Sequence, residues 1–302
     1  MNKPHPYTSA YLLWAENVEG KSQATLNAQK QDLRLFETWL NENELTIEEV
    51  NSHDLQTFVD SLSLRYASSS IARLCSTLRA FYEFLSVRYE MDNPCALLES
   101  PKKEKKLPLW ISAEEMDAVL GTFDQSDKGI LDKTILMVLY STGLRVSELC
   151  SLQMRDVRLS QQTIRVLGKG QKQRQLPLNE RVCRQMELYE STVRQPKTSS
   201  SAYFFVSLKG AKLNRQYVYS LVKKVAMEDH LSPALSPHSL RHSFATRLIE
   251  HDTDLRLVQE LLGHSDIRTT QIYTHVDSSR LKNSVDSALP DFDLFGEDEQ
   301  EK

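Results

Sequence analysis

The chain has 302 residues, enough for about two domains, and its 40% hydrophobic content is ordinary for a globular protein. No apolar run approaches the roughly 20 residues of a membrane helix, and the N-terminus lacks the apolar segment of a signal peptide, so we expect a cytoplasmic protein without a membrane partner. The four cysteines are widely spaced, which favours reduced thiols over a disulfide framework or a zinc site; they are Cys75, Cys95, Cys150 and Cys183.

The net charge of −4 is concentrated near the C-terminal end. Residues 290–302 contain six acidic residues and one lysine, so we expect a disordered acidic tail. The other 289 residues hold 36 basic and 35 acidic side chains. A nearly neutral body can still bind DNA through basic side chains gathered on one face, so composition neither demands nor excludes nucleic acid.

Residues 1–99 show apolar side chains at helical spacing and almost no strand pattern. Four amphipathic stretches predict a four-helix bundle of about 90 residues. Arg73 and Arg79 fall on its outer faces, where they are either solvated or in contact with DNA phosphates.

A basic, proline-containing stretch, SPKKEKKLPL, covers residues 100–109 and separates this bundle from the rest of the chain. Pro101 and Pro108 prevent a helix, so we expect an extended linker. The linker contains four lysines, Lys102, Lys103, Lys105 and Lys106. They could simply be solvated, and they could also make salt-dependent contacts with the DNA backbone.

The second predicted domain covers residues 110–289 and is mostly helical. Residues 130–140 are strongly apolar and predict a central helix, which Gly143 ends. Arg145 begins the next helix in the string TGLRVSEL, where it could simply pair with Glu148, three residues later.

Residues 157–178 carry the clearest strand pattern in the chain. Alternation over residues 163–167 and 173–178, with Gly168-Lys169-Gly170 between them, predicts a β-hairpin. The turn is not a nucleotide-binding phosphate loop, because it precedes a strand instead of a helix. Lys169 could be an ordinary turn lysine or a proton donor on a flexible side chain.

Residues 237–250 predict a helix with Leu240, Phe244 and Leu248 on its buried side. His238 and Arg241 share another face, so we expect them to form an exposed polar pair. His238 and His242 are four residues apart, a spacing that could indicate a zinc site. The H-E-x-x-H motif has a glutamate directly after its first histidine, but Ser239 stands there, so we expect no metal.

A further amphipathic helix follows, with Leu255, Val258, Leu261 and Leu262 expected on its apolar face and Gly263 at its end. His264 then lies in a turn, and Tyr273 follows nine residues later on another helix. A straight helix over 265–273 would separate these two side chains by about 13 Å along its axis, so the segment must bend or Tyr273 must move when DNA binds. Residues 278–289 predict one more amphipathic helix.

The residue types in these motifs suit phosphodiester chemistry without a metal. Such chemistry needs a nucleophile, cations on the phosphate oxygens and a proton donor for the departing oxygen. Arginine binds phosphate through two parallel hydrogen bonds and keeps its charge, and a tyrosine nucleophile preserves the bond energy as a phosphotyrosyl link. Taken singly each residue would be structural; the set in order is far more specific.

The ordered motifs resemble those of the tyrosine recombinase and integrase family: T-G-L-R-x-S-E-L, a lysine in a β-turn, H-x-x-R, L-G-H and a tyrosine nine residues later. Length and the helical N-terminal part look most similar to the Xer branch. The resemblance implies a SAM-like core-binding domain, a mostly helical catalytic domain with a small β-sheet, and a catalytic set of Arg145, Lys169, His238, Arg241, His264 and the nucleophile Tyr273.

The same resemblance implies that the partner is double-stranded DNA, bound by four protomers of one or two recombinases, with a DNA translocase as a possible activator and no cofactor. Its expected role is resolution of chromosome or plasmid dimers at cell division. Integration of a phage or other mobile element, a type IB topoisomerase, and a non-catalytic DNA-binding module are the alternatives.

Overall fold

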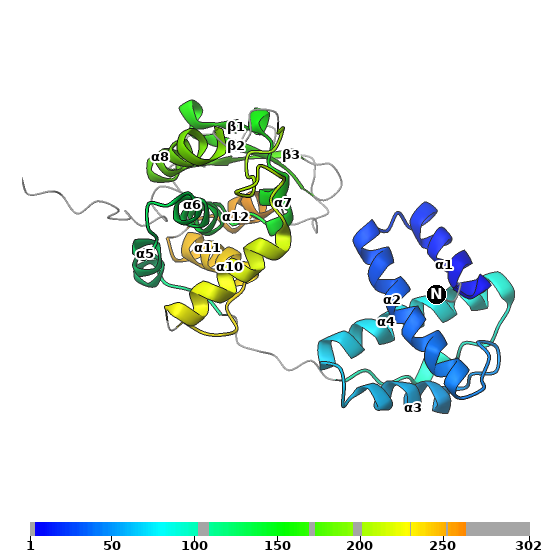
Figure 1. Cartoon of the computed structure of the whole chain (residues 1–302). Coiled ribbons are helices and arrows are strands. Elements are labelled where there is room, and N and C mark those ends of the chain that lie inside the picture. Colours follow the sequence, from blue (N-terminus) through cyan, green and yellow to red (C-terminus); the bar gives the residue numbers. More distant parts are fainter. Residues whose placement is uncertain are drawn as a thin grey trace, which may run out of the picture. The chain divides into compact units, whose positions relative to one another are not determined.

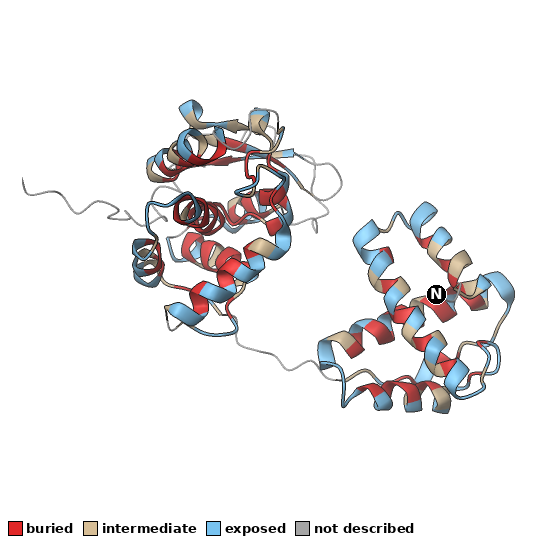
Figure 2. Ribbon diagram, in the orientation of Figure 1, coloured by how far each residue is buried: buried red, intermediate tan, exposed pale blue. Residues whose placement is uncertain are grey.

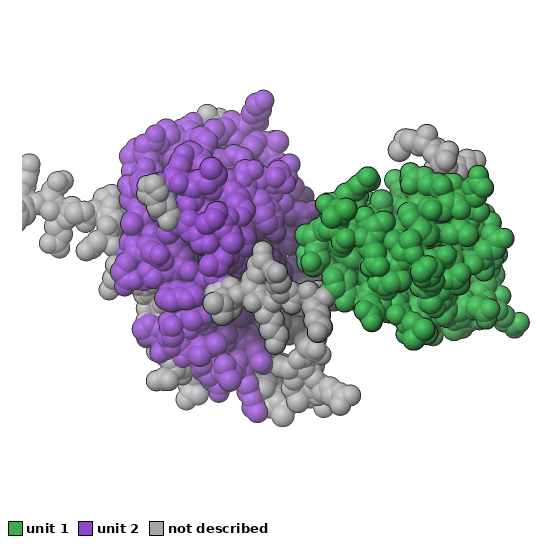
Figure 3. All heavy atoms as spheres, turned by 90° about the horizontal axis from the view of Figure 1, so that it is seen from below, with its two compact units in different colours: residues 1–106 green, residues 107–302 purple. Residues whose placement is uncertain are grey.

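The computed structural model describes residues 4–101, 109–168, 173–195, 201–229, 231–251 and 253–263. The chain divides into two compact units, Met1–Lys106 and Leu107–Lys302, and each has its own hydrophobic core (Figures 1 and 3). In the described ranges, no helix is both long and apolar enough to cross a bilayer.

Unit 1 is the predicted bundle of four helices. They are α1 (Pro6–Asn17), α2 (Gln23–Glu42), α3 (Ser52–Leu62) and α4 (Ser68–Tyr89), followed by the 3-10 helix η1 (Pro94–Leu97). Local sequence fixes the helix starts: the Ser22 side chain accepts a hydrogen bond from the backbone of Thr25, and Asn51 and Asp54 form a reciprocal capping box. Helix α4 ends before Glu90, which adopts the left-handed conformation, and Pro94 begins η1.

The core of unit 1 is rich in aromatic rings. Figure 2 shows in red the stretches of these helices whose residues are buried. Phe36, Phe58 and Tyr82 are among the fully buried side chains, and their rings pack at tilted or edge-on angles. Helix α4 contacts α1, α2 and α3, so this one helix joins the bundle together.

Unit 2 is built around α6 (Asp127–Thr142), most of whose residues are buried. A helix that is apolar all round belongs in the centre of a domain. Figure 1 shows the small sheet and α8 (Glu180–Leu188) on one side of α6, and α10 (Arg215–Glu228) and α11 (Pro237–Glu250) on the other. The other helices in the described residues of the unit are α5 (Ala113–Gly121), α7 (Val146–Ser151), α12 (Leu255–Leu262), the 3-10 helices η2 (Met154–Asp156) and η3 (Leu159–Gln161), and the π-helix η5 (Tyr189–Arg194).

The sheet is antiparallel and contains β1 (Val157–Arg158), β2 (Thr163–Leu167) and β3 (Gln173–Pro177), in that order. The predicted hairpin of β2 and β3 is confirmed, with Leu167 opposite Gln173 at the end where the connection leaves the sheet. The two-residue β1 is an addition that the sequence did not predict, because two residues are too few to show alternation.

Helices α11 and α12 lie against the turn between α6 and α7. The predicted buried residues of α11, Leu240, Phe244 and Leu248, are all buried. Gly143 ends α6 with a φ of 61°, and a Cβ atom at this position would lie 2.5 Å from Cδ1 of Phe244. The α6–α7 turn therefore approaches α11 as closely as only a glycine allows.

One apolar position of α12 was predicted wrongly. Val258, Leu261 and Leu262 are buried as expected, but Leu255 is 61% exposed. Leu255 is the first residue of α12 and directly follows the N-cap residue Asp254, so it lies where the helix has only begun to contact the core.

Candidate active site

Arg145 is fixed by its place at the start of α7. It is the N-cap residue, and its backbone N–H donates a hydrogen bond of 2.8 Å to Oε2 of Glu148. Its guanidinium donates to Oε1 of Glu148 at 3.0 Å from Nη1 and to the carbonyl of Gly263 at 3.2 Å from Nη2. The pairing of Arg145 with Glu148, which the sequence offered as the alternative to a catalytic role, is thus present. It orients the Arg145 side chain but does not occupy all of its N–H donors.

Arg241 is buried, which corrects the prediction that it would be exposed beside His238. Its Nη1 donates to the carbonyl of Gly143 at 2.5 Å, and its Nη2 donates to the carbonyl of Leu262. These carbonyls belong to the ends of α6 and α12, where helices leave acceptors unpaired. Arg241 is buried because these two helix ends cover it and supply acceptors.

The site is electrically positive and partly desolvated. Burial, and then the nearby charge of Arg145, lower the pKa of Arg241 to about 10, which leaves the guanidinium charged at neutral pH. Burial alone would raise the pKa of Glu148, but hydrogen bonds and charge from Arg174 and Arg145 outweigh burial and lower it. One carboxylate therefore lies among three guanidiniums, and the excess positive charge favours an anion.

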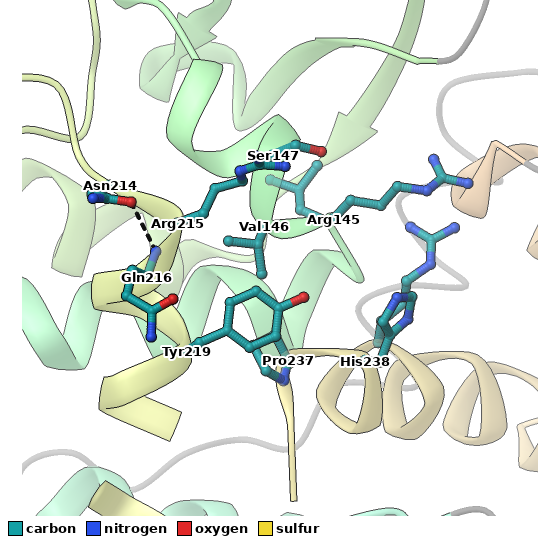
Figure 4. Close-up of a pocket in the computed structure, with 11 residues that line it drawn as sticks. Arg145, Val146, Ser147, Asn214, Arg215, Gln216, Tyr219, Pro237 and His238 are labelled. Carbon is teal, nitrogen blue, oxygen red and sulfur yellow. Dashed lines mark hydrogen bonds between the residues drawn. The ribbon is translucent and has the colours of Figure 1, made fainter. Parts of the chain in front are cut away.

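His238 projects from the start of α11 and is exposed, as predicted. Pro237 and the capping box of Ser236 and Ser239 fix this helix start. Figure 4 shows Arg145 and His238 on the same side of an open pocket of about 370 Å³. Arg241 also lines this pocket, so three of the predicted catalytic residues, from α7 and α11, meet at one place.

The opposite side of the pocket comes from the start of α10, which the sequence did not single out. Asn214, Arg215, Gln216 and Tyr219 line it, and all are exposed (Figure 4). A signal for them existed: Val218, Leu221, Val222 and Val225 are the buried positions of α10, so residues 215, 216 and 219 share the outer face. Nothing in the sequence alone shows which part of the domain that face would meet.

Three predicted catalytic residues, Lys169, His264 and Tyr273, lie outside the described residues. Lys169 lies in the connection that leaves the sheet at the Leu167–Gln173 pair. His264 follows Gly263, whose carbonyl accepts the hydrogen bond from Arg145.

The predicted DNA-binding arginines have partners within unit 1. Arg73 pairs with Asp32 at 2.7 Å, with 48% of its side chain still exposed. Arg79 donates to the carbonyl of Leu98 at 2.6 Å and to Oγ of Ser100 at 3.0 Å. Arg79 therefore fixes the end of the bundle, and Arg73 has more of its surface available to a phosphate. The lysines Lys102, Lys103, Lys105 and Lys106 lie outside the described residues.

In the described part of the chain, no group of three or more His, Cys, Asp or Glu side chains could hold a metal ion. The four cysteines are all free and buried, as expected for small apolar side chains.

Two family models match the chain. Residues 109–280 match the phage integrase family, and residues 10–88 match the phage integrase N-terminal SAM-like domain.

Curated relatives extend the likeness over most of the chain. A tyrosine recombinase XerD of Staphylococcus haemolyticus (strain JCSC1435) is 38% identical over 286 residues, which are 93% of this chain and 97% of the relative. The XerD of Staphylococcus aureus (strain N315) is 37% identical over 286 residues, with the same coverage.

Solved structures share the fold. A XerH site-specific recombinase bound to a palindromic difH substrate, in a post-cleavage complex, gives a TM-score of 0.69 at 21% identity, covering 92% of this chain and 83% of that one. The Tn1549 transposon integrase in complex with circular intermediate DNA gives 0.69 at 17% identity, covering 92% and 98%.

Proposed function

Because the chain belongs to the phage integrase family as a Xer-type site-specific tyrosine recombinase, which cuts and rejoins DNA, we propose that its pocket binds the scissile phosphate and that Tyr273 attacks it. The observation that carries this proposal is the meeting of Arg145, Arg241 and His238 in one open, positive pocket. A non-catalytic DNA-binding module would not need this grouping.

The two arginines are suited to the non-bridging phosphate oxygens. A guanidinium has five N–H donors. Arg145 directs Nη1 and Nη2 to Glu148 and Gly263, and Arg241 directs its pair to Gly143 and Leu262. Each of these nitrogens carries a second hydrogen, and Nε is a further donor, so both arginines can bind phosphate without releasing their contacts with the protein.

The proposed reaction is a transesterification. The Tyr273 hydroxyl oxygen forms a bond to phosphorus as the bond to the 5′-oxygen breaks, leaving a 3′-phosphotyrosyl link and a free 5′-hydroxyl. His238 accepts the tyrosine proton, Lys169 donates a proton to the departing 5′-oxygen, and His264 donates a hydrogen bond to the phosphate. Attack of another strand's 5′-hydroxyl reverses these steps and rejoins DNA.

The substrate is double-stranded DNA, and we propose that it crosses the pocket along the start of α10. Arg215 and Gln216 are exposed there and can donate hydrogen bonds to phosphates or base edges. The lysines of residues 102–106 and Arg73 would add contacts with the DNA backbone.

We further propose four protomers per synapse, with or without a second recombinase, and resolution of chromosome or plasmid dimers with a translocase as activator. Integration of a mobile element remains the second candidate, because it uses the same residues.

The decisive experiment is covalent trapping on a nicked duplex, in which the short cut strand diffuses away and rejoining cannot occur. We expect the wild-type chain to form a DNA-linked species that survives denaturation, and Tyr273→Phe to bind DNA equally well without forming one. Tyr219→Phe is the matched control, since Tyr219 is the tyrosine that lines the described pocket. Adduct formation by Tyr273→Phe would rule out the proposed nucleophile.

A further inference from the structure

Arg174, in strand β3, has a side chain only 9% exposed and touches two parts of the active site. Its Nη1 and Nη2 donate to the two oxygens of Glu148, both at 2.9 Å, in a bidentate pair. Its Nε donates to the carbonyl of Leu261 at 2.8 Å. No proposed catalytic role uses this residue, yet three of its donors have well-formed partners.

Glu148 is shared between Arg174 and Arg145. Oε1 accepts from Nη1 of both arginines, at 2.9 and 3.0 Å, and Oε2 accepts from Nη2 of Arg174 and from the backbone of Arg145. The carboxylate is 5% exposed, so it depends on these four hydrogen bonds to remain charged. Movement of Arg174 would free Glu148 to turn, and the Arg145 guanidinium would turn with it.

The end of α12 is the second point of contact. Three successive carbonyls there, of Leu261, Leu262 and Gly263, accept from Arg174, Arg241 and Arg145 respectively. A helix leaves its last carbonyls unpaired, and its negative end favours cations. The three guanidiniums thus fix the residue before His264, and the charge of the helix end keeps them together.

We propose that Arg174 is a positioning residue for strand cleavage: it holds the Arg145 guanidinium through Glu148, and it holds the end of α12 through the carbonyl of Leu261. It does not touch DNA. Because it lies five residues after Lys169 on the strand that leaves the same hairpin, it also joins that hairpin to the arginines. This inference rests on the proposed role of Arg145 at the phosphate.

The test compares Arg174→Lys with Arg165→Lys. Arg165 is the matched control, because it lies on the neighbouring strand and pairs through Nε and Nη2 with Asp156 instead of with Glu148. A lysine at 174 cannot contact both Glu148 oxygens and Leu261 together. We expect Arg174→Lys to slow cleavage of the nicked duplex by about 10- to 100-fold. DNA affinity and melting temperature should stay close to those of Arg165→Lys.

A second substrate separates positioning from simple structural support. Replacing a non-bridging oxygen of the scissile phosphate by a methyl group removes the charge that Arg145 meets. The defects of Arg145→Ala and Arg174→Lys should both shrink on this substrate, and on normal DNA the defect of the double variant should be smaller than the product of the two single defects. A purely structural loss would be equal on both substrates and would add to that of Arg145→Ala.

The outcomes distinguish the inference from the function on which it rests. Normal cleavage by Arg145→Ala would refute the proposed phosphate site. Loss of cleavage in Arg145→Ala, with Arg174→Lys no slower than Arg165→Lys or equally slow on both substrates, would refute only the role of Arg174. If Arg174→Lys proves unstable, the double variant Arg174→Gln/Glu148→Gln removes both buried charges together and serves in the same comparison.

Discussion

Arg145 and Arg241 present the same chemical group to the pocket from different surroundings. Arg241 is buried between two helix ends, and its lowered pKa means that an anion beside it relieves an unfavourable charge. Arg145 is half-buried and shares Glu148 with Arg174. We infer that Arg241 provides a fixed positive centre and that Arg145 is the more adjustable partner.

Lys169 offers a residue-level prediction about the leaving group. Lys169→Ala should cleave ordinary DNA slowly, because the departing 5′-oxygen needs a proton. A substrate with sulfur in place of that oxygen should restore cleavage, since a thiolate leaves without protonation near neutral pH. The measurement is the single-turnover cleavage rate on both substrates. Lys172→Ala is the control; sulfur rescue of that variant, and not of Lys169→Ala, would make Lys172 the acid.

The sequence predicted which side chains meet better than it predicted their burial. The helical pattern of α11 correctly separated Leu240 and Phe244 from His238 and Arg241. It could not show that Arg241 is buried, because the covering groups, the carbonyls of Gly143 and Leu262, come from other helices. Arg174 gave no signal at all, since its partners are also distant in sequence.

Helix ends, more than helix faces, build this site. Gly143 and Gly263 both end helices in the left-handed conformation, and the carbonyls of both accept hydrogen bonds from the proposed catalytic arginines. A glycine at a helix end is a local feature, so the sequence predicted the ends at Gly143 and Gly263 correctly. The π-helix η5, which follows α8 and contacts α6, is not predicted by any local pattern.

Gly143→Ala tests the close approach of α6 and α11. The left-handed conformation costs a non-glycine residue about 1–2 kcal/mol, and displacement of Phe244 by the new methyl group adds about 1–3 kcal/mol. We expect a loss of roughly 2–5 kcal/mol in the free energy of unfolding. Gly121→Ala, a helical position in the same unit with nothing within 4 Å, is the control and should be neutral or slightly stabilising. Equal urea midpoints for the two variants would contradict the tight contact.

At the scale of the whole molecule, two units with separate cores allow DNA binding and cleavage to be divided between them. The sequence predicted the unit-1 bundle well because its apolar stripes are long and regular. The sequence predicted the pocket of unit 2 only through the family motifs. The residues that line this pocket come from α7, α10 and α11, which are far apart in the sequence.

The predicted helix 278–289, which lies outside the described residues, offers a test of assembly. Leu281, Val285 and Leu289 form an apolar stripe on it, and a neighbouring protomer could bury that stripe. Truncation after Asp277 should leave binding to one half-site within a few fold, weaken cooperative binding to two half-sites and abolish strand exchange. Gel-shift titration on both DNAs measures this; unchanged cooperativity and recombination would exclude a role in assembly.

The central claim, that Tyr273 becomes joined to DNA, is tested most directly by identifying the linked residue in the trapped complex. The adduct is digested with protease and nuclease, and mass spectrometry locates the nucleotide on the peptide. We expect the nucleotide to be on Tyr273, joined through its 3′-phosphate, with a 5′-hydroxyl on the released strand. A nucleotide on Tyr219 or any other residue, or a link through a 5′-phosphate, would contradict the proposed mechanism.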